Sequence, residues 1–240
     1  MKRQLCGFGL IAVVLAMLVQ TCIGKNAAEI LKQESRNTIS LELEFSKKNP
    51  NPLQRFVSFL NWGPNGYATG FLVGNHLVMT AYHVVSGKLT LSKRAILGFG
   101  ADDELKVTVH VNGCLASVVK IDEDADLALL SVCRTPKETR TPAFQAQPDK
   151  DEKLLLIARP HGDKMVSEGN FYGPYSFRGQ QYWSARIDPR EGYSGSPVYN
   201  RKAELVGVFS GYDWSQKLAV ISTGSRAQRL LEGYVSNAKP

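Results

Sequence analysis

The sequence has few of the residues that metal and redox sites need. It contains four histidines and four cysteines in 240 residues, and their spacings do not match those of metal ligands. A glycine-rich phosphate loop is also missing. The formal net charge is +7, yet no stretch concentrates lysine and arginine or interleaves them with aromatic residues. We therefore expect no metal, no cofactor and no nucleic-acid partner, and a solvated basic surface explains the charge.

Long apolar runs are missing too, except for one near the N-terminus. This run extends from Leu5 to Val19 and follows two basic residues. A membrane span needs about 20 apolar residues, so the run is typical of a secretory signal peptide over residues 1–24. It predicts a secreted or periplasmic protein. An uncleaved segment would instead anchor the chain in a membrane, and a lipid on Cys22 is a third alternative that the preceding residues match poorly.

Two cysteines lie beyond that segment, Cys114 and Cys133, on either side of an acidic turn. If the flanking strands pair antiparallel about this turn, residue 121 lies opposite 126 and Cys114 lies opposite Cys133. Export would allow this pair to oxidise. Two buried free thiols are the alternative.

What the chain does contain is a serine between glycines. Residues 192–197 read GYSGSP and precede an apolar strand. A serine hydroxyl attacks a carbonyl only if a base takes its proton and donors stabilise the oxyanion. Glycine at 192 allows the N–H groups of Gly192 and Ser194 to point into one hole, a conformation that a Cβ would resist. These two residues are the predicted oxyanion hole.

A base and an orienting acid lie upstream. His83 follows an apolar run, and Asp126 enters an apolar strand directly after the solvated acids at 122–124. His83 would take the proton of Ser194, while Asp126 would hold the other ring N–H. The α/β-hydrolases run serine, acid, histidine along the chain. Here all four histidines precede Ser194, which excludes that fold.

The order histidine, aspartate, serine resembles that of trypsin-like serine peptidases of the bacterial kind, similar to HtrA protease domains and glutamyl endopeptidases. This resemblance implies an all-β fold of two antiparallel six-stranded β-barrels with a short C-terminal helix and the site between the barrels. Tyr193 stands where trypsin has an acid that pairs with a new N-terminus, so that activation is not available. The matching motifs are TAYH at 80–83, DLAL at 126–129, GYSGSP at 192–197 and GVFSG at 207–211.

Strand and turn signals divide the chain further. The polar, lysine-rich residues 25–50 predict a linker or a pro-segment, which the enzyme itself could remove. The first strand signal is an alternating run at 55–60. The peptidase domain is then expected over residues 51–240, with barrels at about 53–140 and 150–224 and a helix at about 225–235.

The resemblance also implies substrate contacts. Asp188 lies six residues before Ser194, where trypsin has the acid of its S1 pocket, which favours Arg or Lys before the cleaved bond. A loop acid paired with a nearby arginine is the alternative. Phe209 argues against an acidic residue there, and Ser210 and Gly211 would pair with the substrate backbone. We predict an exported serine endopeptidase acting on polypeptides through an acyl-enzyme. The alternative is a protease-like module that binds peptides without turnover, and the oligomeric state stays open.

Overall fold

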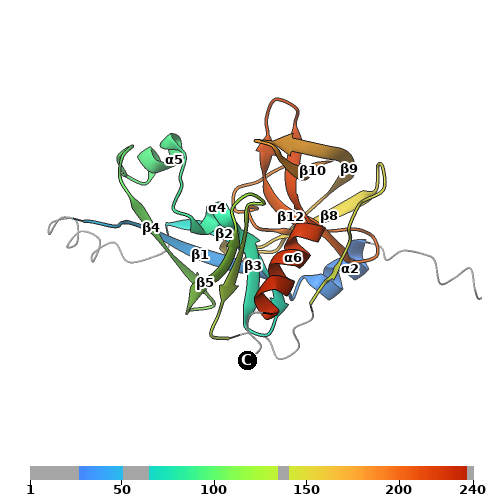
Figure 1. The fold of residues 1–240 in the computed structure, drawn as a ribbon, viewed down its shortest axis with the longest axis horizontal. Helices are drawn as coiled ribbons and strands as arrows, with labels where there is room; N and C mark the ends of the chain where they lie inside the picture. Colours follow the sequence, from blue (N-terminus) through green and yellow to red (C-terminus); the bar gives the residue numbers. More distant parts are fainter. Residues whose placement is uncertain (1–26, 51–64, 135–140, 237–240) are drawn as a thin grey trace, which may run out of the picture.

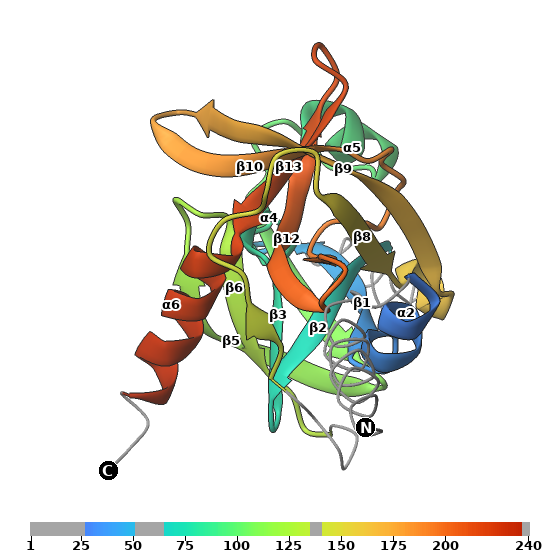
Figure 2. The same ribbon diagram turned by 90° about the vertical axis from the view of Figure 1, so that its right-hand side faces the viewer.

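The computed structural model describes residues 27–50, 65–134 and 141–236. The expected signal segment at 1–24 and the expected strand at 55–60 lie outside these ranges. Within them the chain forms two β-barrels, with helix α6 (Gly224–Val235) packed at their junction (Figure 1). Figure 2 shows α6 and helix α2 (Ala27–Glu34) on opposite flanks of the molecule. None of the helices in these ranges is long and apolar enough to cross a bilayer.

The first barrel is a closed antiparallel sheet in the order β1-β2-β3-β6-β5-β4. Side chains alternate in and out along β1, so Leu41, Leu43 and Phe45 fill the barrel. Helices α4 (Tyr82–Val85) and α5 (Leu91–Ile96) connect β3 to β4. The strands are β1 (Thr38–Lys47), β2 (Gly66–Gly74), β3 (Leu77–Ala81), β4 (Leu105–Val111), β5 (Cys114–Asp122) and β6 (Leu127–Ser131).

The second barrel has the order β11-β8-β9-β10-β13-β12 and closes through pairing of β11 with β12. A two-residue strand, β7 (Ala143–Phe144), adds parallel to β12, and a 3₁₀ turn, η2 (Pro160–Gly162), follows β8. The prediction of two antiparallel six-stranded barrels with a C-terminal helix is therefore confirmed. The strands are β8 (Lys153–Ala158), β9 (Met165–Phe177), β10 (Gln180–Arg186), β11 (Pro197–Tyr199), β12 (Glu204–Asp213) and β13 (Leu218–Thr223).

Three apolar clusters stabilise this arrangement. One fills the first barrel, one fills the second, and the third lies between them. The third cluster joins strands of both barrels to the helices at either end of the described chain, through residues such as Ile30, Met79, Leu129, Leu155 and Leu230. This shared core fixes one barrel against the other, and the site lies across their junction.

The prediction of a linker at 25–50 was wrong for most of its length, and its removal as a pro-segment stays a prediction. Residues 38–47 form β1, which pairs with both β2 and β4, and Ile30 of α2 is only 1% exposed. The first barrel thus begins at residue 38 rather than near 53. Glutamates alternate with the apolar residues of β1, and lysines follow them. This alternation is the period-2 pattern of a half-buried strand, but the polar, lysine-rich composition of residues 25–50 favoured a linker.

Cys114 and Cys133 form a disulfide with a Cα–Cα distance of 5.9 Å. The predicted antiparallel pairing of β5 with β6 is confirmed, but its register is not. The register is displaced by one residue on the cysteine side, where Ser117 lies opposite Ser131, and by two near the turn, where Ile121 lies opposite Ala128 rather than residue 126. A bulge between Val118 and Lys120 adds the second residue of this displacement. Such a bulge places an extra residue in one strand.

Candidate active site

Three side chains from distant parts of the chain meet between the barrels. His83 lies on α4, Asp126 lies just before β6, and Ser194 lies on the turn before β11. The His83 Nδ1 is 2.8 Å from Asp126 Oδ2, and its Nε2 is 2.8 Å from Ser194 Oγ. An Nδ1–H donated to the carboxylate leaves Nε2 free to accept the serine proton. The structure therefore brings together all three residues that the sequence predicts.

The Asp126 carboxylate is held by more than the imidazole. Its Oδ1 accepts the backbone N–H of His83 at 2.7 Å, and its Oδ2 also accepts the Ser210 hydroxyl. The backbone of Asp126 has a φ of 53°, a left-handed conformation that aspartate tolerates better than most residues. Its carbonyl accepts the N–H of Tyr82 at 3.0 Å. Strained backbone of this kind persists where the surrounding contacts hold it.

The turn that carries Ser194 requires both of its glycines. Gly192 and Gly195 have φ values of 82° and 84°, and a Cβ on either would overlap Pro160 or Thr80 respectively. Thr69 fixes the turn to the first barrel, because its hydroxyl donates to the Gly192 carbonyl at 2.8 Å and its N–H donates to the Ser194 carbonyl at 3.0 Å.

Two backbone amide groups in the catalytic turn are left without a protein acceptor among the residues described. In the part of the chain that the structure describes, neither the Gly192 N–H nor the Ser194 N–H has an acceptor. Backbone donors in proteins are almost always paired. Two unpaired donors beside a nucleophile form the arrangement that stabilises an oxyanion. This is the pair of donors that the sequence predicts.

Tyr193 points the opposite way, into the second barrel. It is buried, its hydroxyl lies 3.1 Å from Ser167 Oγ, and its ring meets Phe209 edge-on. The turn is therefore held by packing where trypsin uses an ion pair. Backbone bonds add to this, because the Gly195 N–H donates to the Phe209 carbonyl and the Phe209 N–H donates to the Ser196 carbonyl.

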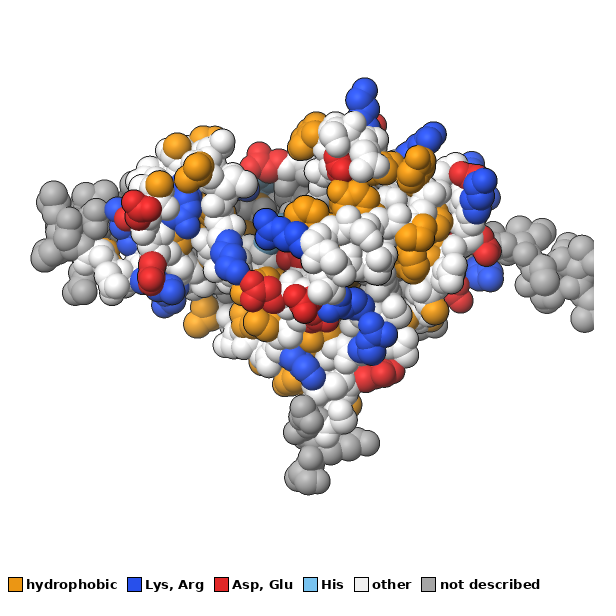
Figure 3. All heavy atoms as spheres, turned by 45° about the horizontal axis from the view of Figure 1, so that its top comes forward, with side chains coloured by type: hydrophobic (Ala, Val, Ile, Leu, Met, Phe, Trp, Pro, Cys, Tyr) orange, Lys and Arg blue, Asp and Glu red, His pale blue; other side chains and the backbone are white. Residues whose placement is uncertain are grey.

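A cleft of about 810 Å³ opens beside His83 and Asp126, between the two halves of the molecule (Figure 3). Ser210 and Gly211 line it, as predicted for a substrate-binding edge. Asp188 is exposed and does not line it. Aromatic residues from both barrels form much of its wall, namely Tyr82, Tyr175, Phe177, Tyr182, Tyr212 and Trp214.

Local contacts shift the pKa of four groups in this wall, because the pKa values of Lys88, Tyr175 and Tyr182 are raised and that of Asp213 is lowered. Burial, together with the nearby Asp126 carboxylate, raises the pKa of the Tyr182 phenol. Bonds from Ser215, Gln216 and Tyr175 lower the pKa of Asp213 to about 2. In the described ranges no group of three histidine, cysteine, aspartate or glutamate side chains is arranged as a metal site requires.

Sequence reasoning missed the residues that support the site from the other barrel. The Tyr182 hydroxyl donates to the Asp124 carbonyl at 2.9 Å, and the Ser222 hydroxyl donates to the Ala125 carbonyl at 2.5 Å. For Ser210 the sequence predicts only that its backbone pairs with the substrate, whereas its side chain also donates to Asp126, the acid of the triad. Tyr182 and Ser222 belong to no local motif, so only the three-dimensional structure identifies them.

Comparisons with known proteins agree with this geometry. A family model described as the trypsin-like peptidase domain matches residues 68–208, more than half of the chain. The fold is similar to the active form of the Rv3671c protease from M. tuberculosis, at 17% identity, with a TM-score of 0.60 and coverage of 88% of this chain and 87% of that one. It is also similar to the inactive form of a serine-to-alanine mutant of that protein, at 16% identity, with a TM-score of 0.57 and coverage of 91% of this chain and 98% of that one. The chain thus belongs to the trypsin-like peptidase family and is a serine endopeptidase.

Proposed function

We propose that this endopeptidase cleaves polypeptides through His83, Asp126 and Ser194 by way of an acyl-enzyme. The observation that carries the proposal is the unbroken line of two 2.8 Å contacts from carboxylate to imidazole to hydroxyl. The unpaired amides of Gly192 and Ser194 support it, because they provide the stabilisation that the hydroxyl alone lacks.

The chemical steps follow from these positions. His83 Nε2 takes the proton of Ser194 as the hydroxyl oxygen attacks the substrate carbonyl carbon. The oxygen of the tetrahedral intermediate accepts the N–H groups of Gly192 and Ser194. The imidazolium, stabilised by Asp126, then protonates the leaving amine, and the peptide bond breaks. Water attacks the resulting ester with His83 again as the base, which releases the acid and restores the serine.

Replacement of the serine tests this proposal. Ser194→Ala should abolish labelling by a fluorophosphonate and lower kcat for casein by about 10⁴-fold or more. Ser196→Ala is the matched control, because its buried hydroxyl lies in the same turn and has no partner in the described residues. It should keep labelling and cleavage. Cleavage that persists in Ser194→Ala would contradict the proposal, and peptide binding without labelling of the wild-type protein would favour a binding module.

We further propose that the protein is exported, as the apolar segment at 1–24 suggests. The bond between Cys114 and Cys133 supports this, because disulfides persist mainly in oxidising compartments. Cell fractionation and N-terminal sequencing of the mature protein test it. A protein recovered in the cytoplasm with its first residues intact would overturn it.

A further inference from the structure

The backbone of β12 is unpaired on one side where it borders the cleft. Its residues from Gly211 onward pair with β13 on one edge. On the other edge, the ladders with β11 and β7 end at Val208 and Leu205. Within the described residues, the stretch 210–213 therefore has a free edge. An extended peptide can add to such an edge as a further strand.

The direction of β12 decides which part of a substrate lies there. The strand runs away from the catalytic turn, since Phe209 bonds to that turn and the free stretch follows it. A peptide added antiparallel runs back toward Ser194, so the residues before its cleaved bond lie along the cleft. Side chains alternate along an extended chain. The cleft is lined by His83 but not by Ser194 or Gly192. It therefore faces the second and fourth residues before the bond, P2 and P4, rather than the first.

The polar groups of the cleft are largely satisfied by one another. The Tyr175 hydroxyl donates to Asp213 at 2.9 Å, and Lys88 pairs with Glu123 at 2.5 Å. Two charged residues of opposite sign, Asp124 and Arg178, are exposed at the rim.

Aromatic rings are the main surface that remains for a substrate side chain to contact. Two of the six rings are covered, because Lys88 lies over Tyr82 and Arg178 lies over Phe177. Two of the others belong to Tyr212 and Trp214, whose rings meet edge-on next to the free edge of β12. Pockets lined in this way bind apolar groups. We propose that the cleft selects bulky apolar side chains at P2 and P4. This inference rests on the proposed function.

Peptide substrates that differ at one position test this specificity. With the wild-type enzyme, kcat/KM should be about tenfold or more higher for Phe or Leu than for Ala at P2 or P4, as expected for burial of a large apolar side chain. Lys and Glu at these positions should be no better than Ala. Trp214→Ala should remove most of the preference at P4, and Trp214 is 77% exposed, so the fold does not depend on it.

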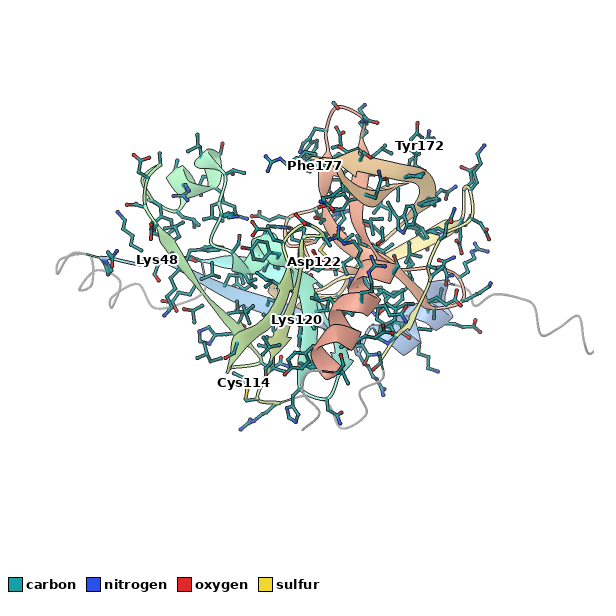
Figure 4. All side chains as sticks on the ribbon, in the orientation of Figure 1. Lys48, Cys114, Lys120, Asp122, Tyr172 and Phe177 are labelled. Atoms are coloured by element: carbon teal, nitrogen blue, oxygen red, sulfur yellow. A yellow bond between two sulfur atoms is a disulfide. The ribbon has the colours of Figure 1, made fainter. Side chains whose placement is uncertain are left out.

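Tyr172→Ala is the matched control. Tyr172 is also an exposed aromatic residue of the second barrel, but it lies on the outer part of β9, away from the side where Phe177 faces α5 (Figure 4). This variant should keep the preference. An enzyme that labels with a fluorophosphonate but shows no preference, or prefers a charged P2 or P4 residue, would overturn this inference and leave the proposed function standing. An enzyme that does not label would overturn both.

A separate set of contacts points to a positioning role for α6. Arg226, in its first turn, donates to both oxygens of Asp122 at 2.8 and 3.0 Å and to Gln180 Oε1 at 2.9 Å. Asp122 lies beside the start of this helix (Figure 4). The same carboxylate accepts the N–H of Ala125 at 3.0 Å, one residue before Asp126.

We infer that Arg226 is a positioning residue that acts through Asp122 on the turn that carries Asp126. A planar guanidinium binds both oxygens of a carboxylate, which an ammonium cannot do in the same geometry. Loss of this contact frees the turn at one end, and the carboxylate that orients His83 moves with it. The second barrel and its helix thereby align an acid that belongs to the first barrel.

Kinetic measurements distinguish a role of Arg226 in aligning Asp126 from a role in stabilising the fold alone. Arg226→Ala should lower kcat about tenfold with KM little changed, and the low-field proton resonance of the bond between His83 and Asp126 should broaden or shift. Arg226→Lys should restore kcat only in part. Arg229→Ala, an exposed arginine one turn further along the helix, is the control and should change neither readout. A lower melting temperature with unchanged kcat and an unchanged proton resonance would show a purely structural role and refute the inference.

Discussion

A substitution in the N-terminal helix α2 tests whether the chain before residue 38 belongs to the folded enzyme. Ile30 is 1% exposed and packs in the cluster between the barrels. Ile30→Ala removes three carbon atoms, worth roughly 2.4 kcal/mol at about 0.8 kcal/mol each, and leaves a cavity that adds to the loss. We expect the free energy of unfolding to fall by about 3 kcal/mol and the melting temperature by about 6–12 °C.

Urea denaturation followed by tryptophan fluorescence measures this loss. Leu91→Ala is the control, because Leu91 also lies on a short helix but is 69% exposed. It should change the free energy of unfolding by less than about 0.5 kcal/mol. Equal values for the two variants would refute the assignment of α2 to the core. So would an active enzyme whose N-terminal sequence begins after residue 47, because β1 supplies two of the ladders that close the first barrel.

Three further predictions concern other parts of the fold. The double variant Cys114→Ser, Cys133→Ser should lose about 3 kcal/mol of unfolding free energy, as expected for a bond that spans 19 positions. It should stay active, because Cys114 lies at the end of the first barrel away from α4 (Figure 4). An unchanged midpoint of urea denaturation would contradict the stability prediction. Gly195→Ala should abolish fluorophosphonate labelling of Ser194 in a protein that still shows strand-type circular dichroism, and normal labelling would disprove the steric argument. The pKa of the Asp213 carboxyl is lowered from 3.8 to about 2 in the folded protein, so the carboxylate should stabilise its loop above pH 4 and lose this effect as the pH falls toward 2. Carbon NMR of the carboxyl group measures this titration, and a midpoint near pH 4 would refute the prediction.

The catalytic residues could be predicted because each lies in a short local pattern. Glycines on both sides of Ser194 indicate a turn that other residues resist, and the structure gives both glycines positive φ values. The position of His83 and Asp126 before it along the chain then excluded the competing fold. The two barrels themselves followed from the resemblance, since strand signals alone do not determine how strands close.

Other features depend on contacts that no local pattern encodes. The residues of β1 alternate correctly, but their pairing with β2 and β4 is what makes them a strand of the barrel. The bonds from Tyr182 to Asp124 and from Arg226 to Asp122 span 58 and 104 positions. The spacing of Asp188 from Ser194 suggests a role in substrate binding, but spacing does not determine where a side chain points, so this role stays a prediction.

The two halves of the chemistry belong to different barrels, so catalysis depends on how the barrels are held together. His83 and Asp126 come from the first barrel, whereas Ser194 and the oxyanion donors come from the second. Thr69, in the first barrel, accepts the Arg159 N–H at 3.0 Å through the same hydroxyl that donates to the Gly192 carbonyl. A small shear between the barrels would lengthen the contact between imidazole and hydroxyl before either barrel unfolds. Substitutions in the shared core should therefore lower activity at temperatures where the protein is still folded.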